Sequence, residues 1–123
     1  MRRPILVVDD DADSRQMLAF VLQCEGHDVV TASNGMEAFN LAREHLPSLI
    51  LLDLMMPIMG GEEFRTAQLA NDNIKGIPVV VLSAHHEVRQ IARRINAVGC
   101  LQKPLDFDAV LQVCERAMRA EPT

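Results

Sequence analysis

The stretch Leu49-Ile50-Leu51-Leu52-Asp53 has four consecutive aliphatic residues followed by a carboxylate. An uninterrupted run of Leu and β-branched residues is typical of a strand buried on both faces of a parallel sheet. Three further runs follow the same pattern: residues 5–8 precede Asp9-Asp10, residues 79–82 precede Ser83, and the weaker run 100–102 precedes Lys103-Pro104. Because parallel strands all point the same way, we expect these polar residues to meet at one edge of the sheet, where open α/β sheets bind their ligands.

Helix-like stretches separate the apolar runs, and capping residues mark their ends. Asp11, Asn34 or Ser33, and Asp106 suit helix N-caps, while Gly26 and Pro47 suit helix ends. We expect strands at 4–9, 28–32, 48–53, 77–82 and 98–102, and helices at 12–25, 35–45, 60–70, 86–96 and 106–119. Five strands alternating with five helices predict an α/β fold with a doubly wound parallel sheet and helices on both faces.

Length, charge and cysteine content limit the class of protein. A chain of 123 residues suits a single domain over 1–123, with a short tail at 119–123. The net charge of -5 argues against a surface that binds nucleic acid, although a local basic patch stays possible. No apolar run approaches the roughly 18 residues that span a bilayer, so no membrane partner is expected. Cys24, Cys100 and Cys114 lack metal-ligand spacing and follow no secretory leader, which is typical of thiols in a cytoplasmic protein.

Four motifs together resemble the receiver domain of bacterial two-component response regulators, in particular the chemotaxis regulators. They are Leu6-Val7-Val8-Asp9-Asp10, the run DLMMPIMG from Asp53 to Gly60, Ser83-Ala84, and Lys103-Pro104. Each motif alone is weak, but the four occur in the family's order and cover residues 4 to about 118. The resemblance implies a five-stranded, flavodoxin-like sheet of strand order 2-1-3-4-5.

The resemblance also assigns the residues at the sheet edge. It implies that Asp53 accepts a phosphoryl group as an acyl phosphate, because a carboxylate can attack phosphorus. It also implies a bound divalent cation, either Mg²⁺ or Mn²⁺. Its direct ligands would be Asp10, Asp53 and the backbone carbonyl of Met55, and Asp9 would act through water. Independently, adjacent carboxylates repel one another, and a hard cation with oxygen ligands relieves this.

Lys103 and Ser83 complete the expected site. By resemblance, the Lys103 ammonium group and the Ser83 hydroxyl hold phosphoryl oxygens, since phosphoryl transfer needs positioning and charge neutralisation above all. In this family the peptide bond between Lys103 and Pro104 is typically cis. The neighbouring acids Asp11 and Asp13 are interpreted as a cap and a first-turn charge that suit the helix dipole.

The chain departs from the family pattern on its output side. Cys100 stands where the family usually has the Tyr or Phe that swings inward on phosphorylation, so the switch of Ser83 and Cys100 lacks its aromatic half. The spacing from Ser83 to Lys103 is about two residues short of the family's, which predicts a shortened fourth helix or leading loop. Leu105 replaces the usual Phe. His85 and His86 are expected to be exposed loop residues, and Arg89, Arg93 and Arg94 a solvated helix face.

The resemblance implies a stand-alone phosphorylation switch and not a turnover enzyme, one that catalyses its own phosphorylation and dephosphorylation. Its partners would be a histidine kinase or histidine phosphotransferase and a downstream protein. Phe20 and Cys24 are expected to stay partly exposed on the first helix, near which partner kinases of the family dock.

Three alternatives remain. A receiver module of a longer regulator or hybrid kinase shares all of this chemistry. A haloacid dehalogenase-type phosphatase needs a second Asp where Met55 stands, and a nucleotide binder needs a Gly-rich phosphate loop, which follows none of the strands.

Overall fold

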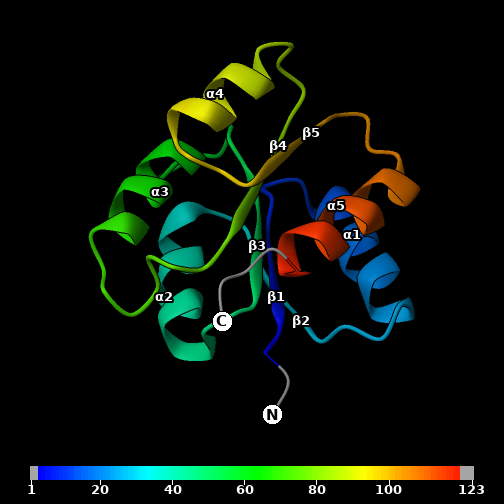
Figure 1. Cartoon of the computed structure of the whole chain (residues 1–123), viewed down its shortest axis with the longest axis horizontal. Coiled ribbons are helices and arrows are strands. Elements are labelled where there is room, and N and C mark those ends of the chain that lie inside the picture. The colour runs from blue at the N-terminus through cyan, green and yellow to red at the C-terminus, as the bar shows by residue number, and fades with distance from the viewer. Residues whose placement is uncertain (1–2, 120–123) are drawn as a thin grey trace.

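The computed structural model, which describes residues 3–119, contains one sheet of five parallel strands covered by five helices (Figure 1). The sheet order is β2-β1-β3-β4-β5, as predicted. The strands are β1 (Ile5–Val8), β2 (Val29–Ala32), β3 (Leu49–Asp53), β4 (Val79–Ser83) and β5 (Gly99–Gln102). The helices are α1 (Ala12–Cys24), α2 (Gly35–His45), α3 (Gly61–Leu69), α4 (Val88–Arg94) and α5 (Phe107–Arg119). The predicted α/β class is therefore confirmed.

The start of β4 and both ends of α4 differ from prediction by two residues, and every other end by at most one. Residues 72–76 form turns before β4, and Pro78 directly before the strand has no N–H for sheet pairing. Of the tail predicted at 119–123, only Arg119 lies within the described residues, as the last residue of α5. No helix in residues 3–119 combines the length and the apolar character needed to cross a membrane.

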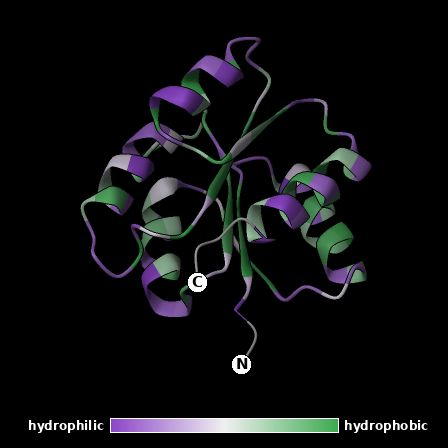
Figure 2. Cartoon of the chain, viewed as in Figure 1, coloured by the Kyte–Doolittle hydropathy of each residue, from purple (hydrophilic) through white to green (hydrophobic). Residues whose placement is uncertain are grey.

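The central strands form the core, as their sequences predict. Every residue of β1, β3 and β4 is buried, whereas the edge strands β2 and β5 are mostly half-buried. Apolar residues of α1 and α5 pack on one face of the sheet, and those of α2, α3 and α4 pack on the other. Figure 2 shows the apolar strands in the middle of the molecule, with the polar helix surfaces outward.

The predicted helix caps are confirmed. The side chain of Asp11 accepts a hydrogen bond from the Ser14 N–H, and that of Asn34 accepts one from the Glu37 N–H at 2.9 Å. Asp106 likewise accepts from the N–H of Asp108 at 2.9 Å at the start of α5. Gly26, with φ of +90°, ends α1 in a left-handed conformation that glycine adopts without strain. These caps fix where the helices begin relative to the strand ends.

A close backbone contact joins the β2–α2 turn to the loop after β3. The Gly35 N–H donates to the Met59 carbonyl at 2.9 Å. A Cβ at position 35 would lie 2.5 Å from that oxygen, so the contact requires glycine. The loop at 54–60, which follows the candidate phosphoacceptor, is therefore held by a neighbouring helix as well as by its own strand.

Helix α4 has only seven residues, in agreement with the predicted shortening, and α3 holds its C-terminal end. The buried Arg65 guanidinium donates to the Ile95 carbonyl at 2.9 Å and to the Asn96 carbonyl at 2.8 Å. It also donates to Oε1 of the buried Gln68 at 2.7 Å, and Gln68 donates to two carbonyls before β4. Burial lowers the pKa of Arg65. Carbonyls at a helix C-terminus carry partial negative charge, so they partly compensate this buried cation.

Candidate functional site

The carboxyl ends of four strands bring the predicted polar residues together. Asp9 follows β1, Asp53 and Ser83 end β3 and β4, and Lys103 follows β5. The first three residues are almost completely buried, at 0%, 4% and 1% exposed respectively. Such burial of two carboxylates beside one another is costly unless cations or donors compensate their charge. The edge is therefore a strongly charged site enclosed by the loops that follow the strands.

Three carboxylates could hold a metal ion. One oxygen each from Asp9, Asp10 and Asp53 lie within 4.8 Å of one another, with Asp10 exposed to solvent and the other two buried. An all-oxygen set with one face open to water fits a hard divalent cation, which keeps several water ligands. The Met55 N–H donates to Asp53 Oδ1 at 3.2 Å, so the backbone of the predicted fourth ligand lies beside the cluster. Metal ligation by the Met55 carbonyl stays a prediction.

Lys103 neutralises the two buried carboxylates. Its Nζ lies 3.0 Å from Asp9 Oδ2 and 3.1 Å from Asp53 Oδ2. Burial by itself lowers the pKa of Lys103, but the hydrogen bonds and the attraction to Asp9 and Asp53 outweigh burial and leave the pKa raised. The ammonium group is thus charged at neutral pH and directed at the Asp53 oxygen. The expected cis peptide bond between Lys103 and Pro104 is confirmed.

The site disfavours the negative charge of the Asp53 carboxylate. Burial raises its pKa, and the neighbouring charge of Asp9 adds to this; the hydrogen bond from Met55 N–H and the contact with Lys103 act in the opposite direction but do not offset the rise. A raised pKa means that the folded protein favours the neutral form of Asp53. Removing that negative charge, or covering it with a cation, therefore relieves an unfavourable interaction.

Ser83 is buried beside this cluster. Its hydroxyl oxygen accepts the His85 N–H at 3.0 Å, and its carbonyl accepts the Lys103 N–H at 2.8 Å. The serine therefore connects the β4–α4 loop with the lysine. His85 and His86 in that loop are exposed as expected, and their rings stack with centroids 4.9 Å apart. Cys100 is different: it lies within β5, half-buried, and packs against the core cluster that includes α4, away from the strand-end carboxylates.

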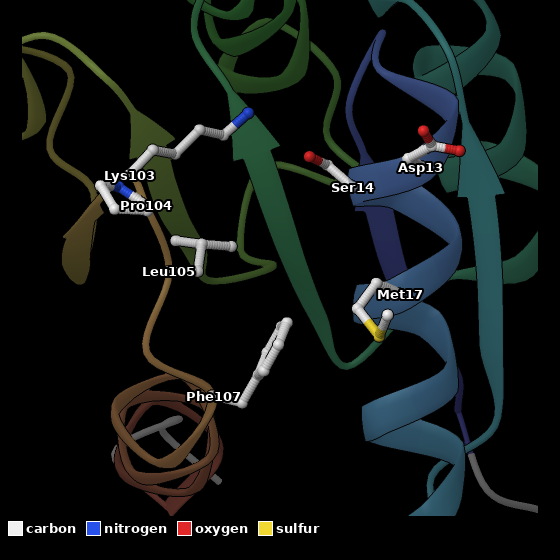
Figure 3. Close-up of a pocket in the computed structure, with 7 residues that line it drawn as sticks. All are labelled: Asp13, Ser14, Met17, Lys103, Pro104, Leu105 and Phe107. Carbon is white, nitrogen blue, oxygen red and sulfur yellow. The ribbon is translucent and has the colours of Figure 1, made fainter.

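An open hollow of about 300 Å³ adjoins the site (Figure 3). Met17 and Ser14 on α1 face Leu105 and Phe107 across it, and Lys103 lies at one end (Figure 3). On the same helix, Phe20 is 61% exposed and Cys24 is exposed, as predicted. The charged edge therefore continues into an accessible apolar surface.

Two hydrogen bonds to Asp9 could not be predicted from the sequence motifs. The Arg15 guanidinium donates to the Asp9 carbonyl at 2.8 Å, and the Asp11 N–H donates to Asp9 Oδ1 at 3.0 Å. Both come from the start of α1, which the cap at Asp11 places next to the β1 end. The one signal for the Arg15 contact in the sequence is the cap at Asp11. It starts α1 directly after β1 and thereby brings Arg15, six residues after Asp9, close to the end of that strand.

Comparisons with known proteins identify the family of the chain. Residues 5–115 match the model of the response regulator receiver domain. The polar-differentiation response regulator DivK of Brucella anthropi is 30% identical, over 91% of this chain and 93% of that protein. An uncharacterised 14.6 kDa protein of Leptolyngbya boryana is 37% identical, over 96% of this chain and 92% of that protein.

Longer relatives and solved structures match as well. The DNA-binding response regulator MtrA of Mycobacterium tuberculosis is 44% identical over 84 residues, which are 68% of this chain but span only 36% of MtrA. The chemotaxis regulator CheY4 of Vibrio cholerae superposes with a TM-score of 0.87 at 32% identity, over 95% of this chain and 99% of that one. The chain belongs to the receiver domain family of two-component response regulators.

Proposed function

We propose that this protein accepts a phosphoryl group on Asp53 in a Mg²⁺-dependent reaction, with a histidine kinase or histidine phosphotransferase as donor. The observation that carries the proposal is the environment of Asp53. Its buried carboxylate ends β3, one oxygen lies 3.1 Å from Lys103 Nζ, and two further carboxylates lie within 4.8 Å. A nucleophile, a cation and a metal-binding set are what phosphoryl transfer to a carboxylate requires.

Each residue of the site has its own role in the proposed phosphoryl transfer. An Asp53 oxygen forms a bond to phosphorus while the bond from phosphorus to the donor's histidine nitrogen breaks. Because the other ring nitrogen of that histidine carries a proton, the donor leaves as a neutral imidazole and Asp53 holds an acyl phosphate. Lys103 turns from the carboxylates to the transferred oxygens, and the Ser83 hydroxyl donates to another. Asp10, Asp53 and the Met55 carbonyl would hold Mg²⁺, with Asp9 bound through water, and the ion would offset the charge that develops on the phosphoryl oxygens.

The decisive test is labelling by a small donor. Incubated with Mg²⁺ and acetyl phosphate, the protein should gain the mass of one base-labile phosphoryl group. Asp53→Asn should abolish the gain, and Asp13→Asn, which removes an exposed carboxylate from the first turn of α1, is the matched control and should keep it. Equal labelling of the Asp53→Asn protein would exclude Asp53 as the acceptor.

Metal binding has a separate readout in stability. A ligand that binds only the folded state stabilises it, by about 2.7 kcal/mol at a concentration 100 times its dissociation constant. Mg²⁺ should therefore raise the melting temperature, and Asp10→Asn should weaken this effect. Because the substitution removes one of three clustered negative charges, the Asp10→Asn protein should be at least as stable as the unchanged protein without Mg²⁺. Easier unfolding of this variant would show that the cluster is not repulsive.

The exposed part of α1 is the proposed docking surface for the phosphodonor. Met17 is 51% exposed and Phe20 61% exposed, and the hollow beside Met17 leads to Lys103. Apolar surface next to a charged reaction centre suits a protein donor that must exclude water around the transferred group. Phe20→Ala should slow transfer from a phosphohistidine protein but leave labelling by acetyl phosphate unchanged.

We further propose a cytoplasmic regulator that acts on a downstream protein partner. Both short regulators such as DivK and CheY4 and the longer MtrA, of which the chain spans about a third, are among its relatives. The complete open reading frame distinguishes the two.

A further inference from the structure

Every polar atom of Asp9 has a hydrogen-bond partner. Its N–H donates to the Ala32 carbonyl at 3.1 Å. Its carboxylate accepts two bonds, Oδ1 from the Asp11 N–H and Oδ2 from Lys103 Nζ, both at 3.0 Å. The remaining atom, the carbonyl oxygen, accepts a bond from the Arg15 guanidinium at 2.8 Å. Because other groups already hold the carboxylate of Asp9, the bond from Arg15 must act on a different part of the site.

The neighbouring Asp10 has no such restraint on its side chain. Its carboxylate is exposed, and no hydrogen bond or ion pair joins it to another group in residues 3–119. It is nevertheless one of the three carboxylates that could hold a metal ion. The direction of the Asp10 side chain therefore depends on the backbone that carries it.

Arg15 acts on that backbone. The Asp9 carbonyl and the Asp10 N–H belong to one planar peptide group, so a bond that fixes the carbonyl also limits rotation of the peptide that leads into Asp10. The backbone of Arg15 is itself fixed, because its N–H donates to the Asp11 carbonyl at 2.9 Å in the first turn of α1. The half-buried arginine thus ties the start of a rigid helix to the peptide between Asp9 and Asp10.

The Arg15 guanidinium contacts this carbonyl although four acidic residues precede it closely in the sequence, at positions 9, 10, 11 and 13. No carboxylate in the described part of the chain lies within ion-pair distance of its nitrogen atoms. Neutralisation of the acidic residues would favour a carboxylate partner, because a guanidinium bonds a carboxylate more strongly than a neutral carbonyl. The contact therefore orients the peptide and does not serve mainly to cancel charge.

We propose that Arg15 is a positioning residue of the metal site, which orients Asp10 through the Asp9 carbonyl and so raises the affinity of the acidic cluster for Mg²⁺. The inference rests on the proposed Mg²⁺-dependent function and adds to it a residue outside the ligand set. Groups that orient metal ligands contribute about ten- to a hundredfold to affinity. The positive charge of Arg15 acts in the opposite direction, because it repels a cation. The two effects therefore differ in sign.

The test is a titration of Mg²⁺ into ¹⁵N-labelled protein, which measures metal affinity without a phosphodonor. In Arg15→Met, which keeps the apolar length of the side chain but has no donor, the dissociation constant should rise about tenfold. Arg15→Lys keeps a donor and the charge but not the planar fork, so the rise should be less than about threefold. Arg93→Met removes an exposed charge from α4 and is the matched control, with an unchanged constant.

A double substitution tests whether Arg15 acts through Asp10. Asp10→Asn alters the ligand that Arg15 orients, so the addition of Arg15→Met should change the dissociation constant by less than about twofold. A further tenfold loss in the double variant would overturn the proposal, because Arg15 would then act through another group.

Equal or tighter Mg²⁺ binding by Arg15→Met would also overturn the proposal, since the guanidinium would then act only as a charge or only on the stability of the fold. At saturating Mg²⁺, acetyl phosphate should label Arg15→Met within about twofold of the rate for the unchanged protein, because Asp53 and Lys103 are intact. Failure of the unchanged protein to be labelled would contradict the proposed function, whereas the comparison of Mg²⁺ affinities decides the role of Arg15 without any phosphoryl transfer.

Discussion

Replacement of Gly35 by Ala tests the contact that holds the loop after the phosphoacceptor. The added Cβ would lie 2.5 Å from the Met59 carbonyl oxygen, about 0.9 Å short of the 3.4 Å at which ordinary contact begins. Met59 Cγ, 2.8 Å away, can rotate, but the carbonyl is fixed by its hydrogen bond with the Gly35 N–H. Overpacking of this kind costs about 1–3 kcal/mol. Alanine in a helix is itself better than glycine by about 0.5–1 kcal/mol, so the net loss should be about 1 kcal/mol.

Gly76→Ala is the matched control, because no heavy atom lies within 4 Å of a Cβ at that position. There the same substitution should stabilise by about 0.4–1 kcal/mol through the unfolded chain. In urea denaturation, the free energy of unfolding should therefore be highest for Gly76→Ala, intermediate for the unchanged protein and lowest for Gly35→Ala. The melting temperature of Gly35→Ala should fall by about 4 °C. Since the displaced loop carries Met55, Gly35→Ala alone should also weaken Mg²⁺ binding. A Gly35→Ala protein as stable as the control would show that the contact is not restrictive.

Three other changes give distinct expectations. Arg65→Met leaves the Ile95 and Asn96 carbonyls without their donor and should cost about 2 kcal/mol in urea denaturation, whereas Glu62→Gln, which breaks an exposed pair, should cost less than about 1 kcal/mol. The raised pKa of Lys103 means that its stabilising contribution is complete below its ordinary value of 10.5 and is lost as pH rises above it, so denaturation between pH 9 and 12 should show a loss that Lys103→Met lacks. Beryllium fluoride should shift the amides of residues 83–90 strongly and those of 99–101 weakly, because Cys100 supplies no ring to move; an equal response at Cys100 would contradict this.

The strands and the residues at their ends were predictable because short, continuous stretches of the sequence determine both. Runs such as Leu49-Ile50-Leu51-Leu52 are apolar at every position and too short for a buried helix, which is typical of a strand buried on both faces. Parallel direction then brings Asp9, Asp53, Ser83 and Lys103 to one edge regardless of loop details. The caps at Asp11 and Asn34 were equally local, since a cap bonds to a residue three positions on.

Contacts between elements were not predictable, because they depend on how distant segments pack. Arg65 resembles any helix-surface arginine in the sequence, and only the arrival of the 95–96 turn over α3 buries it. The need for glycine at position 35 arises from Met59, 24 residues away.

The hold of Arg65 on residues 95 and 96 determines how α4 can move. Seven helical residues span about 10 Å, and the restraint acts at the C-terminal end only. The other end follows the loop from Ser83 to Glu87, where no side chain caps the helix. A rearrangement around Ser83 should therefore tilt α4 about its far end, with the largest displacement at Val88 and Arg89 and almost none at Ile95. Since Arg116 belongs to α5, such a tilt would change the distance between Arg89 and Arg116, which line two hollows that both adjoin Cys100.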